Sequence, residues 1–182
     1  RRAEVLMRAA DQMDKRKTEL ARIATMEMGK RLKEAEAEVG KCANALRFYA
    51  ENAEKFVADD VRDGPAGRNF VTYLPIGPVL AVMPWNFPYW QCMRFAAPAI
   101  MAGNVGILKH ASNVSQCALE IKRIFLDADA PQGVFQTLLI SSSKVEGILK
   151  DSRVRAATLA GSEGAGSAVA STAGSEIKKT VL

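Results

Sequence analysis

Apolar residues recur with helical spacing through the first 56 positions, and no proline interrupts them. This pattern predicts two long amphipathic helices. The first begins near Val5 and ends at Gly29, a residue suited to a helix C-terminus. The second runs from about Arg31 to Phe56. The two apolar stripes comprise Val5, Leu6, Ala9, Met13, Leu20, Ile23 and Ala24, and then Leu32, Ala35, Val39, Cys42, Ala43, Leu46 and Tyr49.

All prolines and most glycines lie after residue 62, where short apolar runs alternate with amphipathic segments. This alternation predicts an α/β fold with a parallel sheet covered by helices on both faces. Ser112 or Asn113 is expected to cap the helix that follows it. The expected strands cover 70–74 (after a turn-like segment at 63–68), 79–83, 105–109, 133–140, 155–160 and 178–182, and the expected helices cover 88–102, 113–127, 143–150 and 161–174.

The composition narrows the class of protein. With 182 residues, 48% of them apolar, the chain is long enough for one domain with a core and too apolar for disorder. No apolar run reaches membrane-spanning length and no signal-peptide pattern is present, so we expect a soluble, cytoplasmic protein without membrane contact. The net charge of +5 is spread over mixed acidic and basic residues, which argues against a nucleic-acid partner.

The cysteines and the histidine indicate what chemistry is absent. Cys42, Cys92 and Cys117 are odd in number and form no Cys-x-x-Cys pair, so we expect neither a disulfide framework nor a metal site. Each is expected to be a small buried apolar residue within a helix. His110 is the single histidine, and we expect a packed, neutral ring without a catalytic role.

Three predicted strand ends carry polar or glycine-rich residues. Asn86 follows the strand at 79–83, Lys109 ends the strand at 105–109, and Gly161 and Ser162 follow the strand at 155–160. Parallel strands end at one edge of a sheet, and ligands of such sheets bind beyond the carboxyl ends. We therefore expect these residues to share a binding site.

Each of these signals also has an ordinary structural explanation. The G-x-x-G-x-G spacing at 161–166 differs from the dinucleotide fingerprint, and it fits either a phosphate at a helix N-terminus or close packing of a helix on a sheet. Lys109 fits either a ribose or phosphate contact or a lysine that reaches solvent. Asn86 either donates to a reacting oxygen or caps the following helix.

Phe87, Gln91 and Arg94 have i, i+4, i+7 spacing, so they are expected to share one face of the helix at 88–102. That face begins beside Asn86. An arginine in so apolar a stretch either binds an anionic ligand or is a surface arginine or a member of a structural ion pair.

The motifs taken together resemble those of the aldehyde dehydrogenase superfamily over nearly the whole chain. P-I-G-P-V-L-A-V-M-P-W-N-F-P at 75–88 is similar to the segment that leads into the family's active site. G-N-V-G-I-L-K-H-A-S at 103–112 is similar to the family's strand that ends in a ribose-binding lysine. P-Q-G-V at 131–134 and L-A-G-S-E-G-A-G at 159–166 follow at familiar intervals. Y-W-Q-x-M-R-F with K-H-A resembles a bacterial group of NAD(P)-dependent succinate-semialdehyde dehydrogenases.

The resemblance implies an unusual Rossmann-like domain that binds NADP or NAD across these strand ends. It implies that Lys109 holds the adenine ribose, that Ser162 meets the pyrophosphate with Ala165 against the adenine, and that Trp85 flanks the cofactor. Ser112 stands where NAD-preferring relatives often carry glutamate. Without that carboxylate a 2′-phosphate is not repelled, so we expect NADP to be accepted. The other cofactor positions implied by the motifs are Met83, Pro84, Gly133 and Gly161.

The resemblance also implies a chemistry, namely oxidation of an aldehyde through a thiohemiacetal and a thioester on a cysteine. The side-chain amide of Asn86 would form the oxyanion hole. Arg94 would bind the carboxylate of succinate semialdehyde, with Phe87 and Gln91 beside it in the substrate tunnel. The nucleophilic cysteine and general-base glutamate are expected beyond residue 182, so this part alone is expected to be inactive. A CoA-acylating relative and an inert nucleotide-binding module are the alternatives.

The expected organisation has three parts. Residues 1–62 would form the helical part of the cofactor-binding domain, 63–77 an interdomain and oligomerisation arm, and 78–182 the Rossmann-like portion. The chain begins without Met and stops at K-K-T-V-L, which looks like the middle of a strand, so we expect both ends to be cut. The parent protein is expected to be a homodimer or homotetramer that binds a small aldehyde.

Overall fold

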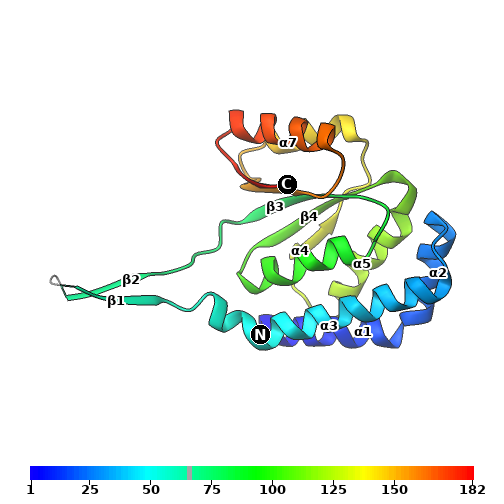
Figure 1. Ribbon diagram of the computed structural model, residues 1–182, viewed down its shortest axis with the longest axis horizontal. Helices are drawn as coiled ribbons and strands as arrows, with labels where there is room; N and C mark the ends of the chain where they lie inside the picture. The colour runs from blue at the N-terminus through cyan, green and yellow to red at the C-terminus, as the bar shows by residue number, and fades with distance from the viewer. Residues whose placement is uncertain (65–66) are drawn as a thin grey trace.

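In the computed structural model, which describes residues 1–64 and 67–182, a parallel sheet lies between layers of helices (Figure 1). The order of its strands is β5-β4-β3-β6-β7, with β3 in the middle. The predicted fold class is therefore confirmed. The strands are β3 (Pro78–Met83), β4 (Val105–His110), β5 (Phe135–Thr137), β6 (Ala156–Leu159) and β7 (Lys179–Val181).

The connecting helices cover both faces of this sheet because the chain leaves β3 in two directions. From β3 it builds outward to β4 and β5, and it then returns to place β6 and β7 on the other side of β3. Right-handed crossovers in opposite directions put the helices on opposite faces. Figure 1 shows α4 (Trp90–Met101) and α5 (Ser115–Asp127) on one face, and α7 (Glu163–Ser175), which follows α6 (Val145–Lys150), on the other.

The two long helical segments predicted before residue 62 are present as an outer layer over α4 and α5 (Figure 1). A break at Arg16 divides the first segment into two helices. The guanidinium of Arg16 is held between Glu19 and Glu120, which ties the break to α5. Gly29 ends the second helix in the left-handed conformation, with φ 77°, as predicted. The helices are α1 (Arg2–Lys15), α2 (Lys17–Met28) and α3 (Leu32–Phe56).

Carboxylates of this outer layer cap the helices of the sheet. Both oxygens of Glu27 accept hydrogen bonds at the start of α5, from Gln116 N at 2.7 Å and Cys117 N at 2.9 Å. The predicted cap by Ser112 or Asn113 is therefore wrong, because Ser112–Val114 forms a short 3₁₀ helix and Glu27 supplies the acceptors. A carboxylate at this position also interacts favourably with the helix dipole.

Residues before the sheet form an antiparallel hairpin, β1 (Asp60–Gly64) and β2 (Gly67–Val71), which extends away from the body (Figure 1). The strand predicted at 70–74 is thus shifted toward the N-terminus. The centre of the predicted turn, residues 65–66, lies outside the described residues. Within 1–64 and 67–182, no helix combines the length and apolar character needed to cross a membrane.

Close packing of β4 on β5 gives a prediction for stability. A Cβ on Gly106 would lie 2.7 Å and 2.9 Å from ring atoms of Phe135, which is itself buried against Phe125. Gly106→Ala is therefore expected to destabilise the protein by about 1–3 kcal/mol, as overpacking does. Urea unfolding of the purified variant would measure the change. Gly147→Ala in α6 is the matched control, because no atom lies within 4 Å of its added Cβ, and it is expected to be neutral or stabilising.

Candidate functional site

The carboxyl ends of the three central strands lie side by side. In the β3–β4 register Val82 pairs with Lys109 and Met83 with His110, and in the β3–β6 register Val82 pairs with Leu159. The segments that follow these strands, at 84–88, 111–112 and 160–162, therefore leave the sheet at one edge. This is also the point where the chain direction across the sheet reverses, and ligands of doubly wound sheets bind there.

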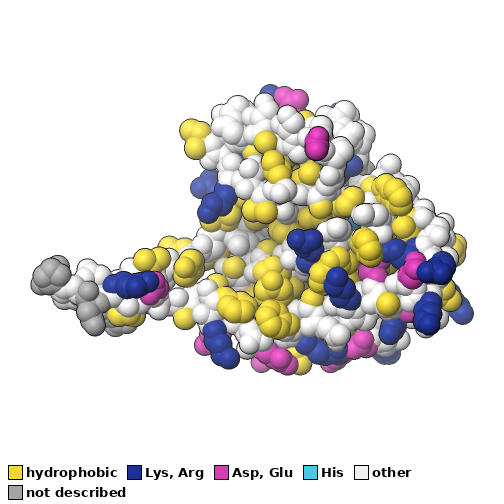
Figure 2. All heavy atoms as spheres, viewed as in Figure 1, with side chains coloured by type: hydrophobic (Ala, Val, Ile, Leu, Met, Phe, Trp, Pro, Cys, Tyr) yellow, Lys and Arg dark blue, Asp and Glu magenta, His cyan; other side chains and the backbone are white. Residues whose placement is uncertain are grey.

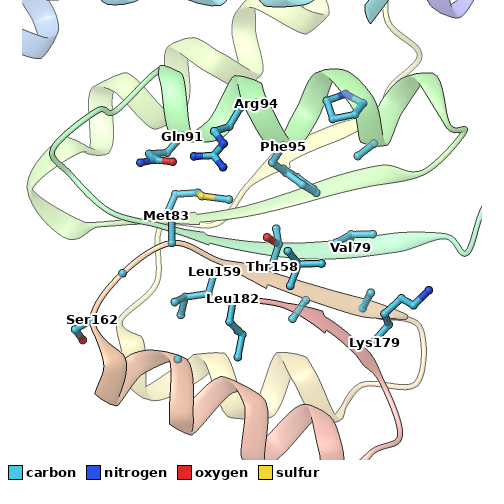
Figure 3. A pocket seen from close by; sticks show the side chains of 18 of the residues that line it. Val79, Met83, Gln91, Arg94, Phe95, Thr158, Leu159, Ser162, Lys179 and Leu182 are labelled. Carbon is cyan, nitrogen blue, oxygen red and sulfur yellow. The ribbon is translucent and has the colours of Figure 1, made fainter. Parts of the chain in front are cut away.

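A large cleft opens at this edge on the α4 face of the sheet. It has a volume of about 710 Å³ and is lined mostly by apolar side chains. Figure 3 shows Gln91 and Arg94 projecting from α4 toward Met83 at the end of β3, with Ser162 across the cleft at the start of α7. Hydrophobic side chains gather in the hollow between α7 and α4 (Figure 2). We call this the larger cleft.

Arg94 lines the larger cleft near Met83, and Glu163 and Lys179 are the other charged residues of its lining. Its side chain is exposed, and among residues 1–64 and 67–182 it forms no ion pair or side-chain hydrogen bond with another residue. Of the two structural alternatives for this arginine, the described residues show no ion pair, while its exposed side chain fits a surface arginine as well as an anion-binding one. A guanidinium with open donors beside apolar walls is suited to an anionic group on a small organic ligand.

A second, smaller cleft of about 240 Å³ lies where α6 and α7 pack beside the same sheet edge. Lys109 lines it and is 9% exposed, and no carboxylate or carbonyl among the described residues pairs with its ammonium group. Ser142, Ser143 and Ala165 of α7 line it as well. A buried ammonium with unused donors, in an open cleft that hydroxyl groups also line, fits a sugar or a phosphate.

The N-terminus of α7 lies between the two clefts. Leu159 at the end of β6 lines both, while Ser162 faces the larger cleft and Ala165 the smaller one. The Ser162 hydroxyl accepts from Ala165 N at 3.4 Å, and the first backbone N–H groups of this 13-residue helix are directed at the edge. A helix N-terminus of this kind favours an anion. The two clefts can therefore hold the two ends of one elongated molecule whose phosphates lie at α7.

The segment at 84–88 carries exposed polar side chains at this edge of the sheet. Trp85 is 50% exposed and Asn86 is also exposed. In the part of the chain that the structure describes, no side-chain hydrogen bond holds the Asn86 amide. Asn86 does not cap α4, because Glu38 supplies the acceptor for that helix: its Oε1 accepts from Tyr89 N and Trp90 N, both at 2.9 Å. The capping alternative for Asn86 is therefore wrong.

Other predicted site residues lie apart from the two clefts. The ring of Phe87 packs under the Lys30 ammonium, 3.8 Å from it, rather than beside Arg94. Pro84 connects β3 to Asn86, and Ser112 begins the exposed 3₁₀ helix just beyond Lys109. Gly161 is the exception, because it lies with Ser162 in the larger cleft.

The position of Gly133 contradicts its predicted place in the site. β5 begins at Phe135, which pairs with Gly106 near the start of β4. Gly133 precedes that strand, so it lies at the amino edge of the sheet, opposite Lys109. The motif P-Q-G-V marks a turn into a strand, with φ 92° at the glycine, rather than a strand end.

Sequence reasoning missed Ser142 and Ser143. The predicted strand at 133–140 extended too far, because β5 ends at Thr137 and the chain then turns into a 3₁₀ helix at Ser142–Lys144. The available signal was a run of three serines after an apolar segment in a chain of alternating strands and helices.

The thiols and the imidazole have environments that suppress their charge. Cys42, Cys92 and Cys117 are buried, and burial raises the pKa of each thiol well above its usual value. None is therefore a thiolate at neutral pH, which is the form that acts as a nucleophile. His110 is buried too, and burial lowers its pKa, so its ring is neutral as predicted.

The strand order is that of a doubly wound α/β domain, and the two clefts beside the N-terminus of α7 lie where ligands of such domains bind. Comparison with known families then gives a narrower class. The model of the aldehyde dehydrogenase family matches residues 1–182. The chain belongs to the aldehyde dehydrogenase family.

Individual relatives are similar over the whole chain. It is 55% identical over 181 residues to a probable succinate-semialdehyde dehydrogenase [NADP(+)] of Synechocystis sp., with 100% of this chain and 40% of that protein covered. It is 56% identical over 184 residues to a succinate-semialdehyde dehydrogenase [NADP(+)] of Mycobacterium avium, covering 100% of this chain and 39% of that protein. The chain thus spans about two fifths of the length of these curated relatives.

Solved structures share the fold closely. The crystal structure of succinic semialdehyde dehydrogenase from Streptococcus pyogenes, in complex with NADP⁺ as the cofactor, superposes with a TM-score of 0.97 at 36% identity. It is matched over 100% of this chain and 40% of that chain. The family predicted from the motifs is confirmed.

Proposed function

We propose that the full-length protein that carries this chain oxidises succinate semialdehyde to the dicarboxylate with NADP⁺. The observation that carries the proposal is one sheet edge that presents an unbonded amide, Asn86, and an unpaired guanidinium, Arg94, beside two clefts joined by a helix N-terminus. The names of the Synechocystis and M. avium relatives support the same substrate and cofactor.

The residues of the edge fit the cofactor. We propose that Lys109, with Ser142 and Ser143, holds the adenosine end in the smaller cleft, and that Ala165 contacts the adenine. Ser162 and the first N–H groups of α7 would hold the pyrophosphate. Met83 and Gly161, which line the larger cleft, would border the other half, and Pro84 and Trp85, which follow Met83 outside the two clefts, would flank it. When bound, the cofactor supplies the hydride acceptor.

Arg94 and Gln91 suit the substrate. Both project from α4 into the larger cleft, and a guanidinium binds a carboxylate through paired hydrogen bonds (Figure 3). An aldehyde with a carboxylate at its other end would be held with the reacting carbon toward the 84–88 segment. The apolar walls would contact the methylene groups between the two functional groups.

The contribution of this chain to catalysis is the amide of Asn86. The overall reaction consumes an aldehyde, water and NADP⁺ and yields a carboxylate, NADPH and two protons. Nucleophilic attack on the aldehyde carbon places negative charge on its oxygen, and the Asn86 N–H is available to donate to that oxygen. The attacking thiolate must come from another residue, because the three cysteines here are buried and protonated.

The hairpin of β1 and β2 supports a further part of the proposal, assembly into a homodimer or homotetramer. It extends from the body and bears exposed apolar side chains, with more on the segment that leads back to β3 (Figure 1). Exposed apolar surface on a projecting arm is suited to contact with another subunit. The residues include Val61, Val71, Tyr73 and Leu74.

The assignment of Ser112 gives a test of the cofactor. Ser112→Glu is expected to lower kcat/KM for NADP⁺ by about tenfold or more, because a carboxylate beside the ribose repels the 2′-phosphate. Activity with NAD⁺ should be kept or increased. Steady-state assays of the full-length enzyme with both cofactors would measure the ratio. Ser115→Glu is the control, since Ser115 lies one turn further on, and an equal loss in both variants would contradict the assignment.

A further inference from the structure

One buried imidazole lies against the backbone on both sides of Asn86, and it bonds to the Pro88 side. His110 is 5% exposed and lies under the 84–88 segment. Its Nδ1 lies 3.2 Å from Met83 O, immediately before the segment, and its Nε2 lies 2.9 Å from Pro88 O, at the end of it. The two carbonyl groups that bracket Asn86 therefore meet the same ring.

The protonation of this ring follows from its partners. A carbonyl accepts, so Nε2 carries the proton that is donated to Pro88 O. Nδ1 in turn accepts from Ala111 N at 2.9 Å, and the same N–H also approaches Met83 O at 3.0 Å. A neutral ring with its proton on Nε2 therefore satisfies both nitrogens, and the position of the imidazole is fixed by β4.

A buried carboxylate holds the chain directly after the segment. Glu38 is 4% exposed and lies on α3, about fifty positions before α4. Its Oε1 accepts from both Tyr89 N and Trp90 N, and its Oε2 pairs with Lys30. The Lys30 ammonium lies 3.8 Å from the centre of the Phe87 ring. The residues directly after Asn86 are thus fixed by hydrogen bonds and by a cation–π contact.

Asn86 itself has no such support. Within the described residues its side chain makes no hydrogen bond, so the direction of its amide depends on the backbone that carries it. Its neighbours Trp85 and Phe87 are exposed, while the side chains that bond to the end of the segment, those of Glu38 and His110, are buried.

We propose that Glu38 and His110 are positioning residues, which hold the 84–88 backbone so that the Asn86 amide keeps its orientation toward the reacting oxygen. The inference rests on the proposed function of Asn86. A displacement of about 1 Å at a reacting group costs roughly 10²-fold in rate, so partial loss of this support should be visible in the chemical step.

A double-mutant cycle with Asn86→Ala tests the inference in the full-length enzyme. The measured quantity is the single-turnover rate of NADPH formation at saturating aldehyde. Glu38→Ala is expected to lower this rate roughly tenfold, with little change in KM for either substrate. In the Asn86→Ala background the same substitution is expected to change the rate by less than about twofold, since coupled residues are not additive.

The outcomes separate the two proposals. If Asn86→Ala alone leaves the rate unchanged, the proposed function of Asn86 fails. If Asn86→Ala lowers the rate and Glu38→Ala lowers it by the same factor in both backgrounds, Glu38 acts through general stability and the positioning role is overturned. Glu38→Gln should restore most of the rate, because its amide oxygen can still accept from the start of α4.

Two further variants control for folding. Glu27→Ala removes the equivalent cap from α5, so it should lower the melting temperature to a similar extent without lowering the single-turnover rate. His110→Leu removes the support that β4 gives to the same segment. It replaces Glu38→Ala in the double-mutant cycle if Glu38→Ala does not fold. It should repeat the non-additive cycle with Asn86→Ala, with partial rescue in His110→Gln, and a fully additive result would overturn the proposal.

Discussion

Asn86→Ala is expected to lower kcat for aldehyde oxidation by roughly 10²–10³-fold in the full-length enzyme, because removal of one oxyanion donor typically has that cost. The amide is exposed at the sheet edge and makes no other side-chain hydrogen bond among the described residues, so little stability should be lost with it. Single-turnover formation of NADPH would measure the effect on the chemical step.

Two controls define what this result would mean. NADP⁺ affinity, followed by quenching of protein fluorescence, should stay within a few-fold of the parent, because Asn86 lines neither cleft. Asn44→Ala changes an exposed asparagine on α3, far from the edge in sequence, and should leave kcat unchanged. A kcat for Asn86→Ala equal to that of the parent enzyme would remove Asn86 from the mechanism.

Arg94→Leu is expected to raise KM for succinate semialdehyde by roughly 10–100-fold, the range for hydrogen bonds to charged groups. Butanal has the same chain length without the carboxylate, and its kcat/KM should be unchanged or improved. The ratio of the two substrates therefore reports the guanidinium–carboxylate contact itself, separately from any general loss of activity.

Two further arginine substitutions serve as comparisons for Arg94→Leu. Arg94→Lys keeps the charge but loses the paired geometry, so it should show an intermediate KM. Arg22→Leu removes an exposed arginine of α2 and should have no effect on either substrate. If Arg94→Leu lowers activity equally for succinate semialdehyde and butanal, the arginine does not recognise the carboxylate.

The sequence predicted those helices and strands whose local pattern of apolar residues and prolines is enough to set their limits. The strand at 79–83 was found almost to the residue, because an apolar run ends at proline on both sides. It did not predict the caps of α4 and α5, because Glu27 and Glu38 are distant in sequence and look like ordinary surface glutamates of an amphipathic stretch. Only packing of the outer helices brings these carboxylates to the helix starts.

Some residues of the candidate site could be predicted from the sequence and others could not. Strand ends with unusual chemistry identified Lys109 and Ser162, since the carboxyl edge follows from parallel topology. Gly133 was misplaced because it was assigned from the resemblance of a motif, although the strand predicted at 133–140 already put it at a strand start, on the amino edge. Phe87 was misplaced because helical spacing was extended back to residues that lie before the first turn of α4, where the chain turns the ring toward Lys30.

The two glutamate caps also bear on how the polypeptide could be divided. Residues 78–182 contain every strand of the sheet, yet the starts of α4 and α5 take their acceptors from residues 27 and 38. Removal of the helices before residue 78 would leave the first N–H groups of α4 and α5 without their acceptors. It would also expose a large apolar surface to water. Residues 78–182 are therefore not an autonomous module, and any transplant of them into another scaffold has to carry the preceding helices along.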